Sequence, residues 1–238
     1  FSMGADGADI NNDGYMDLFT ADMVAEDNFR NKTNMSSMAV EKFWGLVKMG
    51  YHYQFMFNSL QLNNGNGTFS EIAQMSGVSN TYWSWSALFV DADQDGYKDL
   101  FVTNGILKEI RNKDYRNQLK KLVADRKAQA GGNTKFDPLE LSGMAPSVKI
   151  KNRAFRNTGD LVFESKTDAW GFEKPGWSQG MAYADFDQDG DLDFVINNTN
   201  EAADIYRNRV NERGGQNFLS VTATGMPQNG SGGNARVW

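Results

Sequence analysis

Three short segments of the chain carry acidic residues at alternating positions, a pattern suited to holding a hard cation. Each reads D-x-[DN]-x-D-G-x-x-D and is followed by an apolar residue, and together they occupy residues 9–17, 91–99 and 185–193. Carboxylate oxygens spaced two residues apart can converge on one ion, and the glycine permits the sharp turn that this requires. The donor set favours calcium, which takes about six to eight oxygen ligands, over magnesium, which keeps more of its waters.

Each segment is predicted to supply four side chains and one backbone carbonyl, the carbonyl coming from its seventh residue. The candidate metal ligands are Asp9, Asn11, Asp13, Tyr15 and Asp17 in the first segment, Asp91, Asp93, Asp95, Tyr97 and Asp99 in the second, and Asp185, Asp187, Asp189, Asp191 and Asp193 in the third. The last aspartate of each can close the shell, with one or both oxygens. We therefore expect three Ca²⁺ sites, the first being weakest because Asn11 replaces a charged ligand.

An EF-hand would need a bidentate acid at the twelfth position of each loop. That position holds Thr20, Val102 and Ile196, so the EF-hand is excluded. The alternative of acidic turns that bind nothing is disfavoured by the three copies. Several carboxylates brought so close together would repel one another unless a positive charge neutralised them.

Charge and composition narrow the class of protein. The net charge is −6, and twelve of the 30 acidic residues lie in the three segments, so the acidity belongs to sites. An acidic chain is a poor partner for nucleic acid. There is no cysteine, which excludes disulfides and thiolate metal sites. No run of 18 apolar residues is present, so we expect no membrane span.

The acidic segments belong to a longer internal repeat. Asn63, Gly65, Phe69, Gly77, Trp83 and Ser84 recur at one constant offset as Asn157, Gly159, Phe163, Gly171, Trp177 and Ser178. A third copy of the asparagine, Asn208, follows Asn157 by 51 residues, which we take as the bare repeat. By this register the chain starts within a repeat unit.

The flanks of the acidic segments predict strands. Short runs rich in apolar and β-branched residues at 86–90, 100–103, 180–184 and 194–197 are bounded by Gly, Asn and Asp. A repeat of this length with several short strands is typical of a four-stranded propeller blade. Two insertions, at about 24–53 and 106–149, predict helices over 36–49 and 107–129 instead. In the second, Tyr115, Leu119, Leu122 and Val123 share one helix face.

These motifs resemble FG-GAP repeats, also called VCBS repeats, as in the integrin α-subunit propeller. Residues 63–69 (NNGNGTF), 83–85 (WSW) and 189–194 (DGDLDF) are similar to the bacterial branch related to cartilage acidic protein. In that family an ASPIC/UnbV domain follows the propeller, and 217–237 is similar to its start. The resemblance implies a seven-bladed propeller in the intact protein, a binding role, and an extracellular or cell-envelope location.

The expected fold class is therefore all-β: about two and a half propeller blades with two α-helical insertions. Residues 1–208 are expected to form the propeller segment and 209–238 the start of a truncated ASPIC/UnbV domain. We expect a non-catalytic scaffold whose partner is a protein or a glycan. An accessory or catalytic propeller acting on polysaccharide is the alternative, which carboxylates converging in a pocket outside the metal loops would favour.

No other residue marks an active site. His52 is the single histidine, and no G-x-S-x-G elbow is present. Glu164 and Glu173 are unclustered acids and are expected at the surface. The basic residues of 108–127 are interleaved with acids, which indicates a solvated helix face.

Two aromatic features leave functional interpretations open. Trp83 and Trp177 recur with the repeat and are expected in the blade core, whereas Trp85 lacks a matching aromatic residue and is expected at the surface. Both insertions leave the repeat after equivalent strands, so they should lie side by side over one face of the propeller. The large apolar residues at 43–57 either pack on the blades and the second insertion or form, with Trp85, a partner surface.

Overall fold

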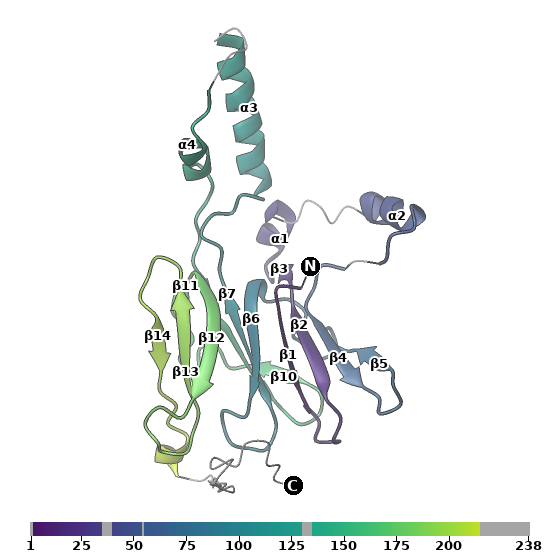
Figure 1. Ribbon diagram of the computed structural model, residues 1–238, viewed down its shortest axis with the longest axis vertical. Coiled ribbons are helices and arrows are strands. Elements are labelled where there is room, and N and C mark those ends of the chain that lie inside the picture. The colour runs from purple at the N-terminus through teal and green to yellow at the C-terminus, as the bar shows by residue number, and fades with distance from the viewer. Residues whose placement is uncertain (1, 35–39, 54, 130–134, 215–238) are drawn as a thin grey trace, which may run out of the picture.

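The computed structural model describes residues 2–34, 40–53, 55–129 and 135–214, and its main elements are antiparallel sheets arranged as blades (Figure 1). The first blade has four strands in the order β1 (Gly4–Ala8), β2 (Asp17–Ala21), β4 (Ser59–Asn63) and β5 (Phe69–Glu71). The second repeats this order with β6 (Tyr82–Val90), β7 (Asp99–Asn104), β9 (Arg153–Asn157) and β10 (Phe163–Ser165), and β3 (Met23–Val24) joins the free edge of β6. The expected all-β, propeller-like fold is confirmed.

The third blade contains β12 (Ser178–Ala184), β13 (Asp193–Asn198) and β14 (Asp204–Tyr206) among the described residues. A small ladder pairs β8 (Ile150–Lys151) with β11 (Pro175–Gly176). In every blade the ninth residue of the acidic segment opens the second strand. Asp17, Asp99 and Asp193 pair with Ala8, Val90 and Ala184, the last residues of the first strands. The acidic loops are therefore the turns of three equivalent hairpins.

Apolar side chains fill the spaces between adjacent blades. Phe19, Leu60, Phe89 and Leu100 are buried between the first and second blades, and Phe101, Phe172, Phe194 and Ile196 between the second and third. The rings of Phe101 and Phe194 are 4.4 Å apart, centroid to centroid. These contacts fix the blades, and with them the acidic loops, relative to one another.

The insertions are helical and lie at the opposite end of the blades from the acidic loops (Figure 1). The first contains α1 (Asn28–Asn34) and α2 (Val40–Lys48), and the second contains α3 (Lys113–Gln129) and α4 (Pro138–Gly143). On α3, Tyr115 is buried and Leu119, Leu122 and Val123 are half-buried, as their shared face predicts. A short 3₁₀ turn, η1 (Asn211–Arg213), follows β14. The predicted helices at 36–49 and 107–129 are shorter in the structure, and residues 35–39 lie outside the described part.

Two expectations about the insertions need correction. The helices α1 and α3 are in contact, as expected, but α2 carries no buried residue and stands apart from them (Figure 1). Trp85 is not a surface residue: it is half-buried, and its indole nitrogen donates to the carbonyl of Gly105 at 2.5 Å. The indole nitrogen is thus satisfied by the residue that directly follows β7.

The repeated tryptophans meet the blade-core prediction in part, since Trp83 packs against the buried Met23 and Met56. Trp83 and Trp177 are both half-buried, and each ring is covered by a basic side chain. Arg111 lies 5.3 Å from the centre of the Trp83 ring, and Lys149 lies 4.9 Å from that of Trp177. Cations stack favourably on indole faces. These tryptophans therefore join the blades to the second insertion.

Candidate metal centres

The three acidic loops share one backbone conformation. Their fourth residues, Asn12, Gln94 and Gln188, have φ of 59°, 56° and 62°, and their sixth residues, Gly14, Gly96 and Gly190, have φ of 87°, 93° and 90°. Two left-handed residues in a six-residue stretch fold the chain back on itself. Glycine meets this need at the sixth position without strain. The sharp turn expected at the glycine of each segment is therefore present, with a positive φ at Gly14, Gly96 and Gly190.

The aspartates at the first and fifth positions of each loop accept hydrogen bonds from backbone amides of the same loop. In the second loop Asp91 accepts from the amides of Asp95 and Gly96 at 3.0 Å each, and Asp95 accepts from the amide of Tyr97 at 3.0 Å. The same three bonds recur in the first loop at 3.1, 2.7 and 2.8 Å and in the third at 3.1, 3.0 and 3.2 Å. These bonds fix both carboxylates against the backbone of their own loop.

The aspartate at the ninth position of each loop, Asp17, Asp99 or Asp193, is buried and connects the loop to the residues at the end of the third strand of its blade. Asp99 accepts from the amide of Ala92 at 3.0 Å and from that of Asn157 at 2.9 Å. Burial raises the pKa of Asp99 to about 7, although both hydrogen bonds act in the opposite direction. Burial also raises the pKa of Asp17, which has equivalent amide partners. A buried carboxylate with a raised pKa is one that a nearby cation would stabilise.

Two of the loops bring three carboxylates together. Asp91, Asp93 and Asp95 each offer an oxygen within 4.8 Å of the other two, and so do Asp185, Asp187 and Asp193. In this geometry Asp99 and Asp189 stand outside those groups. Among the described residues the first loop forms no such group, since its third position is the amide Asn11 rather than a carboxylate. The predicted ligands are thus gathered most fully in the second and third loops.

Buried oxygens without hydrogen-bond partners lie inside the loops. Among the predicted ligands they include Oδ1 of Asn11, Oδ1 of Asp93 and Oδ1 of Asp191, and Oδ2 of Asp189 has only the 3.5 Å ion pair with Arg207. Asn11 and Asp93 occupy the same third position of their loops. A buried acceptor that receives no hydrogen bond is costly, and a cation is the partner that an oxygen-only donor set can take. The donor set therefore fits a hard metal ion, and the acidic clusters could hold one.

Two arginines that the sequence analysis did not select also contact the carboxylates. In the second loop Arg156 donates from Nε to Asp93 and from a terminal nitrogen to Asp95, both at 2.6 Å. In the third loop Arg207 lies 2.5 Å from Asp187 and 3.5 Å from Asp189. The available signal was the repeated Arg-Asn pair, which ends β9 at 156–157 and directly follows β14 at 207–208.

Neighbouring blades also bond directly to the loops. The side-chain nitrogen of Asn157 donates to the carbonyl of Ile10 at 2.8 Å, and that of Asn208 donates to the carbonyl of Ala92 at 2.8 Å. Each asparagine comes from the blade after the loop that it contacts. The repeated asparagine, seen in the sequence only as a marker, is therefore an anchor between blades.

The seventh residues of the first two loops cover the turn between the third and fourth strands. A Cβ on Gly65 would meet the Tyr15 ring at 2.8 Å, and one on Gly159 would meet the Tyr97 ring at 3.0 Å. Both glycines also have positive φ, 69° and 83°. This close approach explains the glycine two residues after the anchoring asparagine. Residues 65–67 thus form a turn between β4 and β5.

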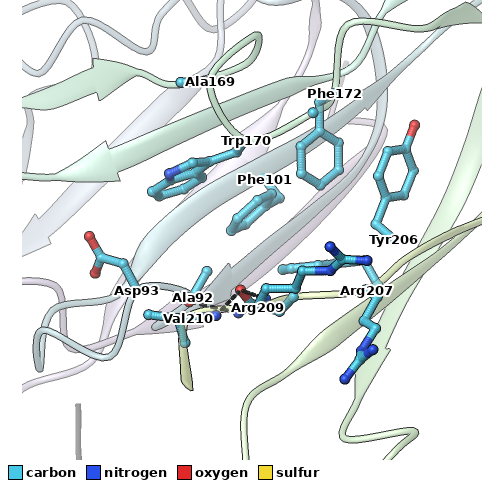
Figure 2. A pocket seen from close by; sticks show the side chains of 13 residues that line it. Ala92, Asp93, Phe101, Ala169, Trp170, Phe172, Tyr206, Arg207, Arg209 and Val210 are labelled. Carbon is cyan, nitrogen blue, oxygen red and sulfur yellow. Dashed lines mark hydrogen bonds between the residues drawn. The ribbon is translucent and has the colours of Figure 1, made fainter. Parts of the chain in front are cut away.

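A cavity of about 340 Å³ lies between the second and third blades (Figure 2). Its walls include Phe101, Trp170, Phe172 and Tyr206. Between the first and second blades the corresponding space is filled by Phe163 of β10, whose amide donates to the carbonyl of Ser76 at 3.0 Å. The third blade has no counterpart of β10 in the described part of the chain. The cavity thus occupies the place that Phe163 fills between the first two blades.

The acidic residues outside the loops that line a surface hollow form ion pairs with basic side chains. A second, open hollow includes Glu26 and Asp168. Glu26 is bound by Arg153 through both carboxylate oxygens, at 2.7 and 2.5 Å, and Asp168 by Lys151 at 2.6 Å. Glu164 is exposed and paired with Lys166, and Glu173 and His52 are exposed as well.

Aromatic residues of the first insertion form a cluster of their own. Phe43, Trp44, Tyr53, Phe55 and Phe57, here called the aromatic cluster, make ring contacts with centroids 5.3–6.3 Å apart. Trp44, Tyr53 and Phe55 remain 49%, 62% and 54% exposed. Among the described residues of 43–57 only Met56 is buried, against Met23. In that part of the chain the expected packing onto the blades is met by Met56, whereas Trp44, Tyr53 and Phe55 face solvent.

Comparison with known families agrees with the repeat architecture. Residues 47–102, which include β4, β5, β6 and the second acidic loop, match the family model of an FG-GAP-like repeat. No curated protein matches the chain. The match does not reach residues 209–238, so the expected ASPIC/UnbV domain has no support from it, and most of that range lies outside the described residues. No helix in the described part is long and apolar enough to cross a bilayer. The chain thus contains an FG-GAP-like repeat within a propeller-like fold.

Proposed function

We propose that this protein is a calcium-binding propeller scaffold that acts outside the cell and binds a protein or glycan without catalysing a reaction. The observation that carries the calcium assignment is the unpartnered, buried oxygen at the third position of two equivalent loops, Asn11 Oδ1 and Asp93 Oδ1. In the second loop the ion would be held by Asp91, Asp93, Asp95 and Asp99 with the carbonyl of Tyr97. Bound calcium would supply charge neutralisation, and the chain supplies a preformed turn.

Three sites follow from the three loops, since all share the same backbone angles and the same amide bonds to the first, fifth and ninth residues. The FG-GAP-like repeat supports this assignment, because such repeats often bind Ca²⁺, and such repeats are typically extracellular. The absence of cysteine is compatible with a scaffold that is stapled by metal instead of by disulfides.

The proposal of a non-catalytic role rests on the acids. A glycosidase-like pair needs two carboxylates that converge on a substrate and differ in protonation. The acids that line the two hollows are Asp93, Glu26 and Asp168, and each is ion-paired with a basic side chain. The aromatic cluster is the surface that we assign to ligand binding, because exposed aromatic groups of this size mark interaction sites.

Thermal melting and calorimetry test the proposal. The 238-residue chain, stripped with EDTA, is titrated with CaCl₂ and in parallel with MgCl₂ and NaCl at matched ionic strength. We expect heat of binding with calcium, a higher melting temperature, and little response to the two controls. Glycan-array and protein-pulldown screens, with and without EDTA, then compare the wild type with Trp44→Ala. An unchanged melting temperature on calcium addition would contradict the metal assignment.

A further inference from the structure

The two arginines stand at structurally equivalent positions. Arg156 and Arg207 each directly precede an asparagine in the sequence. The backbone amide of that asparagine donates to the aspartate at the ninth position of the loop, from Asn157 to Asp99 at 2.9 Å and from Asn208 to Asp193 at 2.8 Å. In the first blade the same amide bond runs from Asn63 to Asp17 at 2.8 Å. The residue before Asn63 is Leu62, so the first loop has no arginine at this place.

The arginine and the third residue of the loop change together. The loop with Leu62 has an amide at the third position, Asn11, whereas the loops with arginine have Asp93 and Asp187 there. In the first loop the side-chain nitrogen of Asn11 donates to Asp13 Oδ2 at 3.0 Å. In the second loop the equivalent oxygen, Asp95 Oδ2, accepts from Arg156 at 2.6 Å. Either an asparagine or an arginine thus supplies one donor to the same atom.

The guanidinium lies on the outer side of the carboxylates and leaves the inner oxygen free. Arg156 takes Oδ2 of Asp93, while Oδ1 of Asp93 is buried and has no hydrogen-bond partner. The planar fork of arginine suits this bridging of two acids. A guanidinium is charged at any ordinary pH, so Arg156 brings one positive charge to these acids. Arg207 repeats the contact to Asp187 Oδ2 and adds Glu212 at 2.6 Å.

We propose, on the basis of the proposed calcium-binding function, that Arg156 and Arg207 are built-in counter-ions that hold the empty loops in shape and moderate their calcium affinity. Counting only the predicted ligand side chains together with Arg156, the second loop carries the same charge as the first, where Asn11 replaces an aspartate. On this count the first loop is no longer expected to bind calcium more weakly than the second. Arginine stabilises the metal-free loop more than the calcium-bound loop, because in the latter it faces a like charge.

The test is a double-mutant cycle that gives the second loop the two residue types found at the equivalent positions of the first. The variants are Arg156→Leu, Asp93→Asn and the pair together, which reproduces Asn11 and Leu62. Arg153→Leu is the matched control, since Arg153 is also a bidentate partner of an acid, Glu26, but one outside the loop. Melting in EDTA reports the empty state, and the backbone amide resonances of Gly14, Gly96 and Gly190 follow calcium at each loop separately.

In EDTA, Arg156→Leu should lower the melting temperature by about 3 °C, a shift reasonable at this chain length for partly exposed charges. Adding Asp93→Asn should restore most of that loss. Calcium titration should show the Gly96 site of Arg156→Leu tighter by about tenfold, as expected when a nearby like charge is removed. The Gly14 and Gly190 sites should be unchanged, and Arg153→Leu should leave calcium affinity at Gly96 unaltered.

The two proposals can fail separately. If Arg156→Leu melts like the wild type in EDTA and binds calcium no more tightly, the counter-ion proposal is overturned. The same holds if the second substitution restores nothing. If the wild type shows no response to calcium at any of the three glycines, the metal assignment fails. The melting temperatures in EDTA still decide whether Arg156 holds the empty loop.

Discussion

The side-chain amide of Gln94 in the second loop donates to the carbonyl of Gly190 in the third, with the nitrogen 2.9 Å from the oxygen. Asn12 makes the equivalent bond from the first loop to the carbonyl of Gly96 in the second, at 3.1 Å. In each case the fourth residue of one loop bonds to the sixth residue of the next. The three loops therefore form a connected row along one end of the blades.

Replacing Gln94 should weaken this row. Gln94→Ala is expected to lower the free energy of unfolding by about 1 kcal/mol, the typical net value of one lost hydrogen bond. Gln94→Asn should retain more of it, since asparagine tolerates the positive φ and Asn12 already makes the same contact. Urea denaturation in calcium measures both. Equal stability of the wild type and Gln94→Ala would show that the contact carries no weight.

Removing one acid should remove one metal site. Asp95→Ala deletes an oxygen donor and leaves Asp91 and Asp93 with less compensation, so calcium binding at the second loop should be lost while the other two loops keep theirs. The stoichiometry in calorimetry should fall by one ion. Asp160→Ala is the control, because Asp160 is an exposed acid in the turn that follows Asn157. A stoichiometry unchanged by Asp95→Ala would exclude the second loop as a site.

Two glycines with the same backbone angle separate strain from contact. Gly159 and Gly171 have φ of 83° and 82°, but a Cβ on Gly159 meets Tyr97 at 3.0 Å, whereas one on Gly171 meets nothing within 4 Å. Both alanine variants should lose about 1 kcal/mol or more from the left-handed backbone. Gly159→Ala alone should also weaken calcium binding at the second loop, because it displaces Tyr97. Similar calcium affinities in the two variants would show that the tyrosine contact is dispensable.

The contact between Tyr82 and Glu109 predicts sensitivity to alkali. The Tyr82 hydroxyl donates to the carboxylate of Glu109. Burial, then this hydrogen bond and the charge of Glu109, raise the Tyr82 pKa above the ordinary value of 10.0. The fold thus favours the protonated phenol, and its contribution is fully present below pH 10 and lost as the pH rises beyond that value.

Unfolding free energies from pH 8 to pH 11 test this assignment. The wild type should lose stability more steeply above about pH 10 than Tyr82→Phe, which has no phenol to ionise. At neutral pH Tyr82→Phe should be the less stable of the two, because Glu109 loses its donor. Tyr53→Phe should follow the wild type throughout, since Tyr53 is 62% exposed. Parallel curves for the wild type and Tyr82→Phe would contradict the assignment.

The local part of the fold could be predicted from the sequence, because it is encoded in short patterns. The turn of the loops follows from Gly96 and its equivalents, and the strands follow from the apolar runs on either side. The anchoring role of Asn157 and the bond of Gln94 depend instead on which blade lies beside which loop, and spacing along the chain does not reveal this. The position of α2 was equally hidden, since the aromatic residues of 43–57 contact one another, and Met56 is the buried residue that packs against β3.

The counter-ions illustrate the same limit. Arg156 lies 61 residues after Asp95 in the chain, yet their side chains are 2.6 Å apart. The sequence indicated that the carboxylates need a neutralising charge, and calcium was the interpretation. The structure adds a second source of positive charge within the blade itself. Antiparallel pairing of β7 with β9 places Arg156, near the end of β9, beside the second acidic loop, which precedes β7.

The anchor from Asn157 to Ile10 also bears on how the chain is assembled during synthesis. The two residues are 147 positions apart, so the first loop lacks one of its supports until nearly the whole second blade has left the ribosome. The second loop waits in the same way for Asn208, 116 positions after Ala92. Each hairpin can form early, but its loop becomes fully braced one blade later. Completion of the row therefore proceeds in the direction of translation, with every blade finishing its predecessor.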